Sequence, residues 1–315
     1  MSKKHRAYDK LLARHRGQTS SKRISYCPIL LFLQKISMNQ SVIANYARLK
    51  ITLLYVPIGL LLLMIIGLYI QKALSINGYG LVQKGLFFFL NSELGSYPAW
   101  MNNLTQIGNE WVFFAFFSIL IIYASEVFGA LIYALLSSAL FVNLFKELFA
   151  VPRPAAFFES SHFYIIGPVL QGHNSFPSGH SATIFVTITV LMFAFCPKTI
   201  KYKIAWFISL ASVGLLLSAT RIGVGAHYPL DVFAGCVLGY ISGLIGIFIN
   251  RKYRGWKWMD KPKFYPFFII LLLICSVLMV IYIFNQQLII YYLAFISTLI
   301  SLFFILKSYV GYVKK

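Results

Sequence analysis

The chain has little charge, and acidic residues are especially few. Charged residues make up 11% of its 315 residues, and aspartate and glutamate together number only 8, whereas a soluble domain carries about 25% charge. Hydrophobic residues make up 59% of the sequence and stand in long uninterrupted runs. The low charge excludes an ordinary soluble domain, and the runs predict several helices that cross a bilayer.

Cysteine is also scarce, and no two cysteines have the close spacing of a metal or redox motif. We therefore predict no disulfide framework and expect the thiols to pack as small apolar groups. We also expect no cleavable signal peptide, because the first long apolar run starts near Ile51, too far along the chain. The four cysteines are Cys27, Cys196, Cys236 and Cys275.

The net charge of +20 would suit a nucleic-acid-binding protein, but the placement of the basic residues argues against it. They flank the apolar runs instead of forming one stripe, which is typical of membrane topology and of contact with anionic lipids. We expect residues 1–48 to be a basic cytoplasmic arm, with its inner stretch YCPILLFLQKI lying in the membrane interface. Membrane lipids, and no nucleic acid, are the predicted partners.

Runs of about 20 apolar residues predict an all-α integral membrane protein with about eight transmembrane helices. Residues 71–110 are mixed, since LVQKGLFFFLN suits a short amphipathic helix and YPAWMNN suits a turn with an interfacial tryptophan. The expected spans are residues 51–70, 111–124, 128–149, 179–195, 204–219, 229–249, 266–284 and 288–306.

Eight spans would place both termini on one side, and the positive-inside rule assigns that side to the cytoplasm. All but five of the 28 lysines and arginines fall on the expected cytoplasmic segments; the exceptions are Lys72, Lys84, Lys146, Arg153 and Arg221. Lys146, Arg153 and Arg221 lie at or near the ends of the third to sixth spans, and this topology places those ends on the external side.

Polar residues gather at these external ends, in KELFAVPRP, PSGH and TRIGVGAHYPLD. Each residue alone has a structural explanation, because cations anchor helices at the interface, and proline, serine and aspartate favour helix starts. Their convergence on one face favours a functional site. The candidate site residues are Lys146, Arg153, Ser178, Gly179, His180, Thr220, Arg221, His227 and Asp231.

Three permanent cations beside a helix start predict a site for a multiply charged anion such as phosphate. We expect the N–H groups of Ser178, Gly179 and His180 to be free donors for this anion. His227 and Asp231 are four residues apart, so a bond to the carboxylate would orient the imidazole as a nucleophile. His180 is then placed to protonate the leaving oxygen.

The three segments resemble, in order, the signature of the type 2 phosphatidic acid phosphatase (PAP2) superfamily. That signature is lysine, six residues and arginine-proline; then proline-serine-glycine-histidine; then serine-arginine, five residues, histidine, three residues and aspartate. Here Thr220 replaces the usual serine and keeps the hydroxyl. The resemblance covers roughly residues 110–250.

By this resemblance, His227 attacks phosphorus and forms a phosphohistidine, Asp231 holds His227, and His180 is the general acid. The resemblance also implies that no metal or other cofactor is needed, and Glu159, His162 and His173 have a poor spacing for metal ligands. The implied phosphate-binding residues are Lys146, Arg153, Ser178, Gly179, Thr220 and Arg221.

The resemblance implies a PAP2-like six-helix core in a catalytic transmembrane domain over residues 49–250, followed by two additional helices over residues 251–315. The expected activity is a metal-independent lipid phosphatase at the periplasmic or external face of an inner (plasma) membrane. The candidate substrates are undecaprenyl diphosphate, lipid A phosphates and glycerophospholipid phosphates.

Other functions and contacts stay open at this point. A lipid phosphotransferase would use the same intermediate, a transporter would spread its charges through the depth of the spans, and a serine protease using Ser178 fits the cations poorly. Gly235, Gly239 and Gly243 form a ladder that permits close helix packing, either within the chain or in a homodimer.

Overall fold

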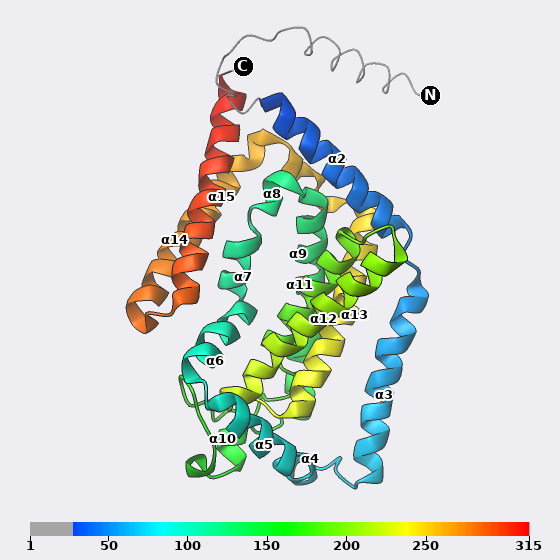
Figure 1. Cartoon of the computed structure of the whole chain (residues 1–315), viewed down its shortest axis with the longest axis vertical. Coiled ribbons are helices and arrows are strands. Elements are labelled where there is room, and N and C mark those ends of the chain that lie inside the picture. Colours follow the sequence, from blue (N-terminus) through cyan, green and yellow to red (C-terminus); the bar gives the residue numbers. More distant parts are fainter. Residues whose placement is uncertain (1–27, 315) are drawn as a thin grey trace.

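The computed structural model describes residues 28–314, and every regular element in that part of the chain is a helix (Figure 1). The all-α prediction is confirmed. Among the described residues, six helices are long and apolar enough to cross a membrane, and α11 is a shorter apolar helix. The protein is therefore a multi-pass membrane protein. Cys27 and most of the predicted basic arm lie outside the described residues.

Long helices and short helical turns alternate along the chain. The longer helices are α2 (Pro28–Ala47), α3 (Tyr55–Ile70), α9 (Ser125–Phe149), α11 (Gly179–Ala194), α12 (Ile200–Gly223), α13 (Pro229–Tyr253), α14 (Tyr265–Gln286) and α15 (Ile289–Val313). The shorter α-helices are α4 (Ile76–Val82), α5 (Lys84–Gly95), α6 (Pro98–Thr105), α7 (Glu110–Phe117), α8 (Leu120–Tyr123) and α10 (Pro154–Phe157). The 3-10 turns are η1 (Ile51–Leu54), η2 (Gln106–Gly108), η3 (Ser160–His162), η4 (Gly255–Asp260) and η5 (Pro262–Phe264).

Two expectations for the first half of the chain are wrong. The expected span 111–124 is broken into α7 and α8. At the break, the hydroxyl of Ser118 donates to the Ala115 carbonyl, a local bond that competes with regular helix geometry. The segment YPAWMNN is not a turn, because Pro98 occupies the first turn of α6, where its fixed φ favours a helix start.

The centre of the bundle is α13, which packs closely against both α9 and α11. The glycine ladder makes this packing possible. A β-carbon at Gly235 would lie 2.5 Å from the Ser178 carbonyl oxygen, and one at Gly239 would collide with the backbone of α11. Of the two uses expected for these glycines, the structure shows packing within the chain, and homodimerisation stays a prediction.

Helix α11 has 16 residues, so it is about 24 Å long, shorter than the roughly 30 Å hydrocarbon core. The last turn of α2 caps the carboxyl end of α11. Asn45 donates to the Ala194 carbonyl at 2.9 Å, and the Tyr46 hydroxyl donates to the Val190 carbonyl at 3.2 Å. The predicted arm thus contains a helix that satisfies the last carbonyls of a short span.

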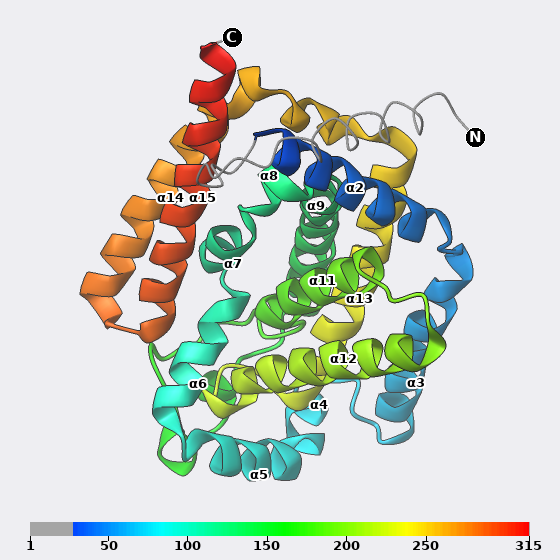
Figure 2. The same ribbon diagram turned by 45° about the horizontal axis from the view of Figure 1, so that its top comes forward.

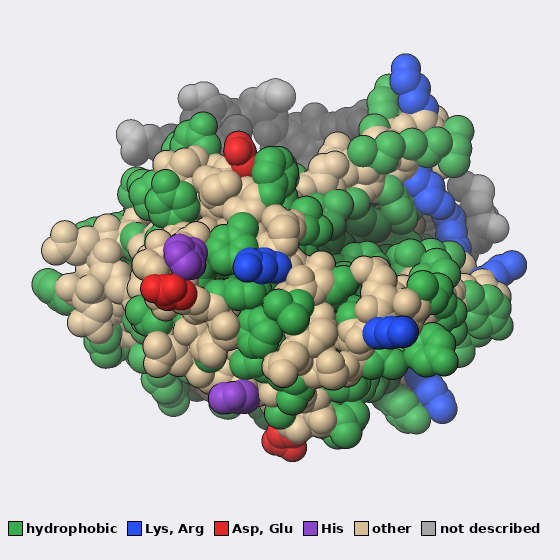
Figure 3. All heavy atoms as spheres, turned by 90° about the horizontal axis from the view of Figure 1, so that it is seen from below, with side chains coloured by type: hydrophobic (Ala, Val, Ile, Leu, Met, Phe, Trp, Pro, Cys, Tyr) green, Lys and Arg blue, Asp and Glu red, His purple; other side chains and the backbone are tan. Residues whose placement is uncertain are grey.

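Helices α3, α14 and α15 stand at the edges of the bundle. The α14–α15 hairpin lies at one side and α3 at the other (Figures 1 and 2). Helices α4, α5 and α10 lie at the lower end of the view in Figure 1. Seen from below, that end carries scattered charged side chains among hydrophobic and other uncharged ones (Figure 3).

Candidate active site

His227 lies in the tight turn between α12 and α13. The turn closes because the Arg221 carbonyl accepts both the Ala226 and His227 N–H groups, and Gly225 takes the left-handed φ of 75° that this path requires. The imidazole is 2% exposed, and its Nδ1 atom lies 2.8 Å from the Ser175 carbonyl oxygen. A carbonyl only accepts, so Nδ1 carries the proton and Nε2 keeps its lone pair.

Asp231 is fully buried, and its carboxylate accepts three hydrogen bonds. The Tyr79 hydroxyl donates to Oδ1 at 2.6 Å; the Ser175 hydroxyl and the Tyr228 N–H donate to Oδ2 at 2.6 and 2.9 Å. The predicted direct bond to His227 is corrected, because Oδ2 is 3.6 Å from Nδ1. Asp231 instead reaches the imidazole through Ser175, which bonds both groups.

Ser175 and Tyr79 were missed in the sequence. Ser175 stands two residues before Pro177, and its N–H donates to the Val151 carbonyl, which ties this loop to the segment after α9. Tyr79 comes from α4, and Gln83, directly after this helix, accepts the Leu230 N–H at 2.7 Å. A polar residue just before PSGH was a usable signal for Ser175, whereas nothing local marked Tyr79.

Arg153 donates to Nε2, the unprotonated nitrogen of His227. Its Nη1 atom is 3.5 Å from His227 Nε2 and donates to the Ala226 carbonyl, while its Nε atom donates to Asn174 at 2.8 Å. Asn174, for which the sequence suggested no role, therefore orients a site cation.

The other two cations approach from α12 and α9. Arg221 donates from Nη1 to the Thr105 hydroxyl at 2.6 Å, and its buried Nε has no partner within residues 28–314. A β-carbon on Gly179 would lie 3.7 Å from Lys146 Nζ, which places this ammonium group over the start of α11. Among the described residues, neither Lys146, Arg153 nor Arg221 forms a salt bridge with a carboxylate.

The start of α11 offers two free backbone donors and not three. The Ser178 N–H donates to the Asp231 carbonyl at 3.0 Å, which corrects the expectation for this group and fixes α11 to α13. The N–H groups of Gly179 and His180 have no hydrogen-bond partner in the described part of the chain. Gly108 allows His180 to sit close to η2, since a β-carbon there would lie 2.7 Å from His180 Cβ.

Thr220 does not contribute a donor to this cluster. Its hydroxyl donates to the Leu217 carbonyl within α12. A phosphate oxygen needs a donor, so the predicted phosphate-binding role of Thr220 has no support in this arrangement.

The electrostatic surroundings of His227 keep its imidazole neutral. Burial lowers the pKa of His227 well below the usual 6.5, and the cations Arg153, Arg221 and Lys146 lower it further. The hydrogen bond to the Ser175 carbonyl raises this pKa, but its effect is smaller. Burial, followed by the Asp231 carboxylate, raises the pKa of Tyr79 well above 10, so Tyr79 remains a donor.

Two of the loop residues with metal-binding side chains lie near each other. Glu159 Oε2 lies 3.8 Å from His162 Nδ1 on the exposed loop. No group of three potential metal ligands is found among residues 28–314.

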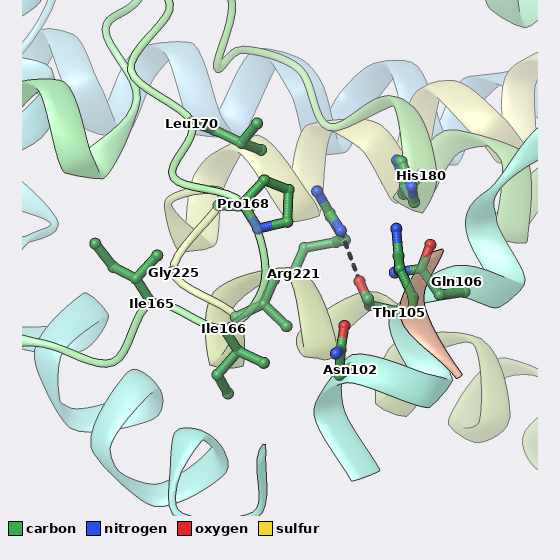
Figure 4. Close-up of a pocket in the computed structure, with 13 residues that line it drawn as sticks. Asn102, Thr105, Gln106, Ile165, Ile166, Pro168, Leu170, His180, Arg221 and Gly225 are labelled. Atoms are coloured by element: carbon green, nitrogen blue, oxygen red, sulfur yellow. Dashed lines mark hydrogen bonds between the residues drawn. The ribbon is translucent and has the colours of Figure 1, made fainter. Parts of the chain in front are cut away.

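A cavity of about 190 Å³ adjoins the cluster and is lined on one side by His180 and Arg221 (Figure 4). Figure 4 shows Arg221 bonded to Thr105, with Gln106 near His180. The other walls come from the loop that contains Ile165 and from the turn after α12.

Comparison with known proteins agrees with this geometry. Residues 127–256 match the sequence model of the PAP2 superfamily. A lipid A 1-phosphatase of Rhizobium johnstonii is 36% identical over 136 residues, which are 41% of this chain and 51% of that protein. An undecaprenyl-diphosphatase of Sulfolobus acidocaldarius is 28% identical over 188 residues, which are 59% of this chain and 86% of that protein.

A solved structure is also similar. The crystal structure of Aquifex aeolicus LpxE aligns with a TM-score of 0.44 and 29% identity, over 53% of this chain and 95% of that one. The chain spans about half the length of the rhizobial lipid A 1-phosphatases that it matches.

Proposed function

With residues 127–256 belonging to the PAP2 superfamily, we propose that the chain is a metal-independent phosphatase of membrane lipids. It removes a phosphate from a phosphomonoester or diphosphate through a phosphohistidine on His227. Its relatives include proteins named for lipid A and for undecaprenyl diphosphate, and the chemistry common to them is hydrolysis of a lipid-linked phosphate.

The observation that carries the proposal is a set of three cations, none of which forms a salt bridge with a carboxylate among residues 28–314. Arg153 and Arg221 are 9% and 7% exposed, and a buried unpaired charge costs several kcal/mol. A bound phosphate would supply the missing negative charge to both arginines and to Lys146, and would fill the free donors at the start of α11.

Because Nδ1 of His227 carries the proton, Nε2 is the nitrogen that can act as the nucleophile. The Nε2 lone pair of His227 attacks phosphorus, and the bond between phosphorus and the leaving oxygen breaks. His180, in the protonated form that the bound phosphate dianion stabilises, gives that oxygen a proton and becomes neutral. The neutral imidazole later removes a proton from the water that cleaves the phosphohistidine. The imidazole becomes positively charged on attack, and the carboxylate of Asp231, held by Tyr79 and Ser175, stabilises this charge.

We place the site at the external face of the inner (plasma) membrane, with both ends of the chain in the cytoplasm. The basic residues support this orientation, because Lys257, Lys261 and Lys263 lie in the η4–η5 segment at the opposite end of α13 from His227. Cysteine labelling at exposed position 173 with an impermeant reagent tests the orientation, and protection in intact cells would contradict it.

Phosphate release by the purified full-length protein in EDTA tests the proposed function. We expect release from lipid phosphates without added metal, and His227→Ala to lower the rate at least 10³-fold. His173→Ala is the matched control, since His173 is exposed. Activity that requires a divalent ion, or survives His227→Ala, would contradict the proposal.

A further inference from the structure

The cavity beside His180 is lined mainly by neutral polar and apolar residues, whereas the phosphate site is built from cations. We propose that it is the leaving-group subsite and that it takes a neutral headgroup bearing hydroxyl groups, either a sugar or a glycerol unit. This inference rests on the proposed function, because it assigns the side of the phosphate from which the alcohol departs.

The position of the cavity relative to the two histidines supports the assignment. His180 lines the cavity, whereas the nucleophile His227 does not. In phosphoryl transfer the attacking and leaving atoms lie roughly in line on opposite sides of phosphorus. A group that enters from the side of the acid His180 is therefore the group that leaves.

Three amide side chains give this cavity its polarity. Asn102, Gln106 and Gln286 line it, and within the described residues the amides of Asn102 and Gln106 have no hydrogen-bond partner. Gln286 accepts from the Tyr291 hydroxyl at 3.2 Å, and its NH₂ group has no partner in the described part of the chain. Amides both donate and accept, which matches hydroxyl groups.

The cavity lacks what a second phosphate would need. Among the described residues, the one cation that lines it is Arg221, which the phosphate site already uses; besides His180, the other polar lining groups are neutral. A diphosphate would leave as a charged phosphate, for which cationic donors are the favourable partners. The lining therefore favours an alcohol over a phosphate as the leaving group.

The size and the apolar wall of the cavity limit the group further. Its volume of about 190 Å³ is many times the roughly 10–15 Å³ that a single water molecule needs. Ile165, Ile166 and Pro168 form one wall, suited to the CH groups of a small ring or polyol. The space suits one headgroup unit.

The amides come from outside the segment shared with the family. Asn102 and Gln106 belong to α6 and η2, and Gln286 ends α14, whereas the family match covers residues 127–256. The α14–α15 turn is fixed to α6 because the Ile290 N–H donates to Asn103 at 3.1 Å. The C-terminal hairpin thus completes the subsite, which gives these two helices a role in substrate selection.

A substrate panel on the purified full-length protein in EDTA tests the inference. It contains a lipid with phosphate on a sugar ring, phosphatidylglycerophosphate and undecaprenyl diphosphate, with p-nitrophenyl phosphate as a substrate without a lipid. We expect kcat/KM for the sugar or the glycerol lipid to exceed that for undecaprenyl diphosphate at least tenfold, and the higher of the two identifies the headgroup.

Preference for undecaprenyl diphosphate by an active enzyme would overturn the subsite and leave the proposed function standing. No hydrolysis of any substrate, p-nitrophenyl phosphate included, would remove the proposed function and this inference with it.

Variants of the amides separate recognition from folding. Gln106→Leu and Gln286→Leu each remove hydrogen bonds, so we expect the preference for the hydroxylated lipid over undecaprenyl diphosphate to fall about three- to tenfold. Asn285→Leu is the matched control, because Asn285 is an exposed amide at the same end of α14 that does not line the cavity. An unchanged preference in both Gln variants, or an equal loss on all lipids, would overturn the inference.

Discussion

The proton on His227 is held by a backbone carbonyl. Nδ1 of His227 lies 2.8 Å from the oxygen of Ser175, and the Ser175 hydroxyl in turn donates to Asp231 at 2.6 Å. The carboxylate therefore acts on the imidazole largely through one serine, whose position is fixed by the loop before α11. This relation leaves Nε2 as the unprotonated nitrogen, on the side of Arg153.

Removing the Tyr79 hydroxyl should weaken both folding and catalysis. Tyr79→Phe deletes a 2.6 Å bond to a buried carboxylate, so we expect a loss of about 1–3 kcal/mol in the free energy of unfolding and a fall in kcat of about tenfold. Thermal unfolding in detergent and steady-state kinetics measure these effects. Tyr228→Phe is the control, because the buried Tyr228 hydroxyl has no partner among the described residues. Equal effects in both variants would contradict the role of Tyr79.

Replacing Arg221 should separate stability from activity. Arg221→Met removes a buried cation without a carboxylate partner, so we expect unchanged or increased thermal stability without ligand. Activity should fall about 10²- to 10³-fold, because a donor to the transition state is lost.

Inorganic phosphate gives a second readout for this variant. Phosphate should raise the melting temperature of the wild type by binding the folded state, and should do so less for the variant. A strongly destabilised variant with an unchanged response to phosphate would show that Arg221 is structural.

The pH at which activity is lost on acidification should lie below the usual pKa of histidine. Burial and the cations Arg153, Arg221 and Lys146 lower the pKa of His227, and only the neutral imidazole attacks. Activity governed by His227 is therefore retained at pH 6.5 and lost as the pH falls through the lowered pKa.

The substrate phosphate itself takes up a proton near pH 6, so kinetics alone would not assign this limb. The assignment uses ¹⁵N NMR of histidine-labelled protein, with His227→Asn to identify the resonance. Titration of His227 at or above 6.5 in the free protein would contradict the lowered pKa.

The glycine ladder should respond to a single methyl group. Gly239→Ala places a β-carbon against the Ala182 carbonyl of α11, so we expect a destabilisation of at least about 1–3 kcal/mol. Gly311→Ala is the control, since nothing lies within 4 Å of a β-carbon there. Size-exclusion chromatography with light scattering supplies the alternative readout. A change in oligomeric state without loss of stability would indicate a dimer face.

Much of the arrangement could be predicted from the sequence, because apolar runs and polar residues at their ends are local signals. Lys146, Arg153, His180 and His227 were found in this way, and the structure brings them to one end of the bundle. The separation of the expected span 111–124 into two helices could not be predicted from hydropathy, since it depends on the bonds of Ser118 to its own helix and to Ser301.

The partners that orient the site could not be predicted in the same way. Tyr79 and Thr105 lie 152 and 116 residues from the groups they contact, and only packing brings them there. The amide of Gln286 likewise reaches the cavity through the fold of a hairpin. Such contacts leave no periodic pattern in the sequence.

Mapping of the phosphorylated residue tests the central claim most directly. The purified protein is incubated in EDTA with a lipid carrying ³²P-labelled phosphate and quenched during turnover, and the acid-labile, alkali-stable label is located by mass spectrometry. The account predicts label on His227 that forms and decays during turnover, and none in His227→Ala. Phosphate release without label on His227, or label on another residue, would contradict it.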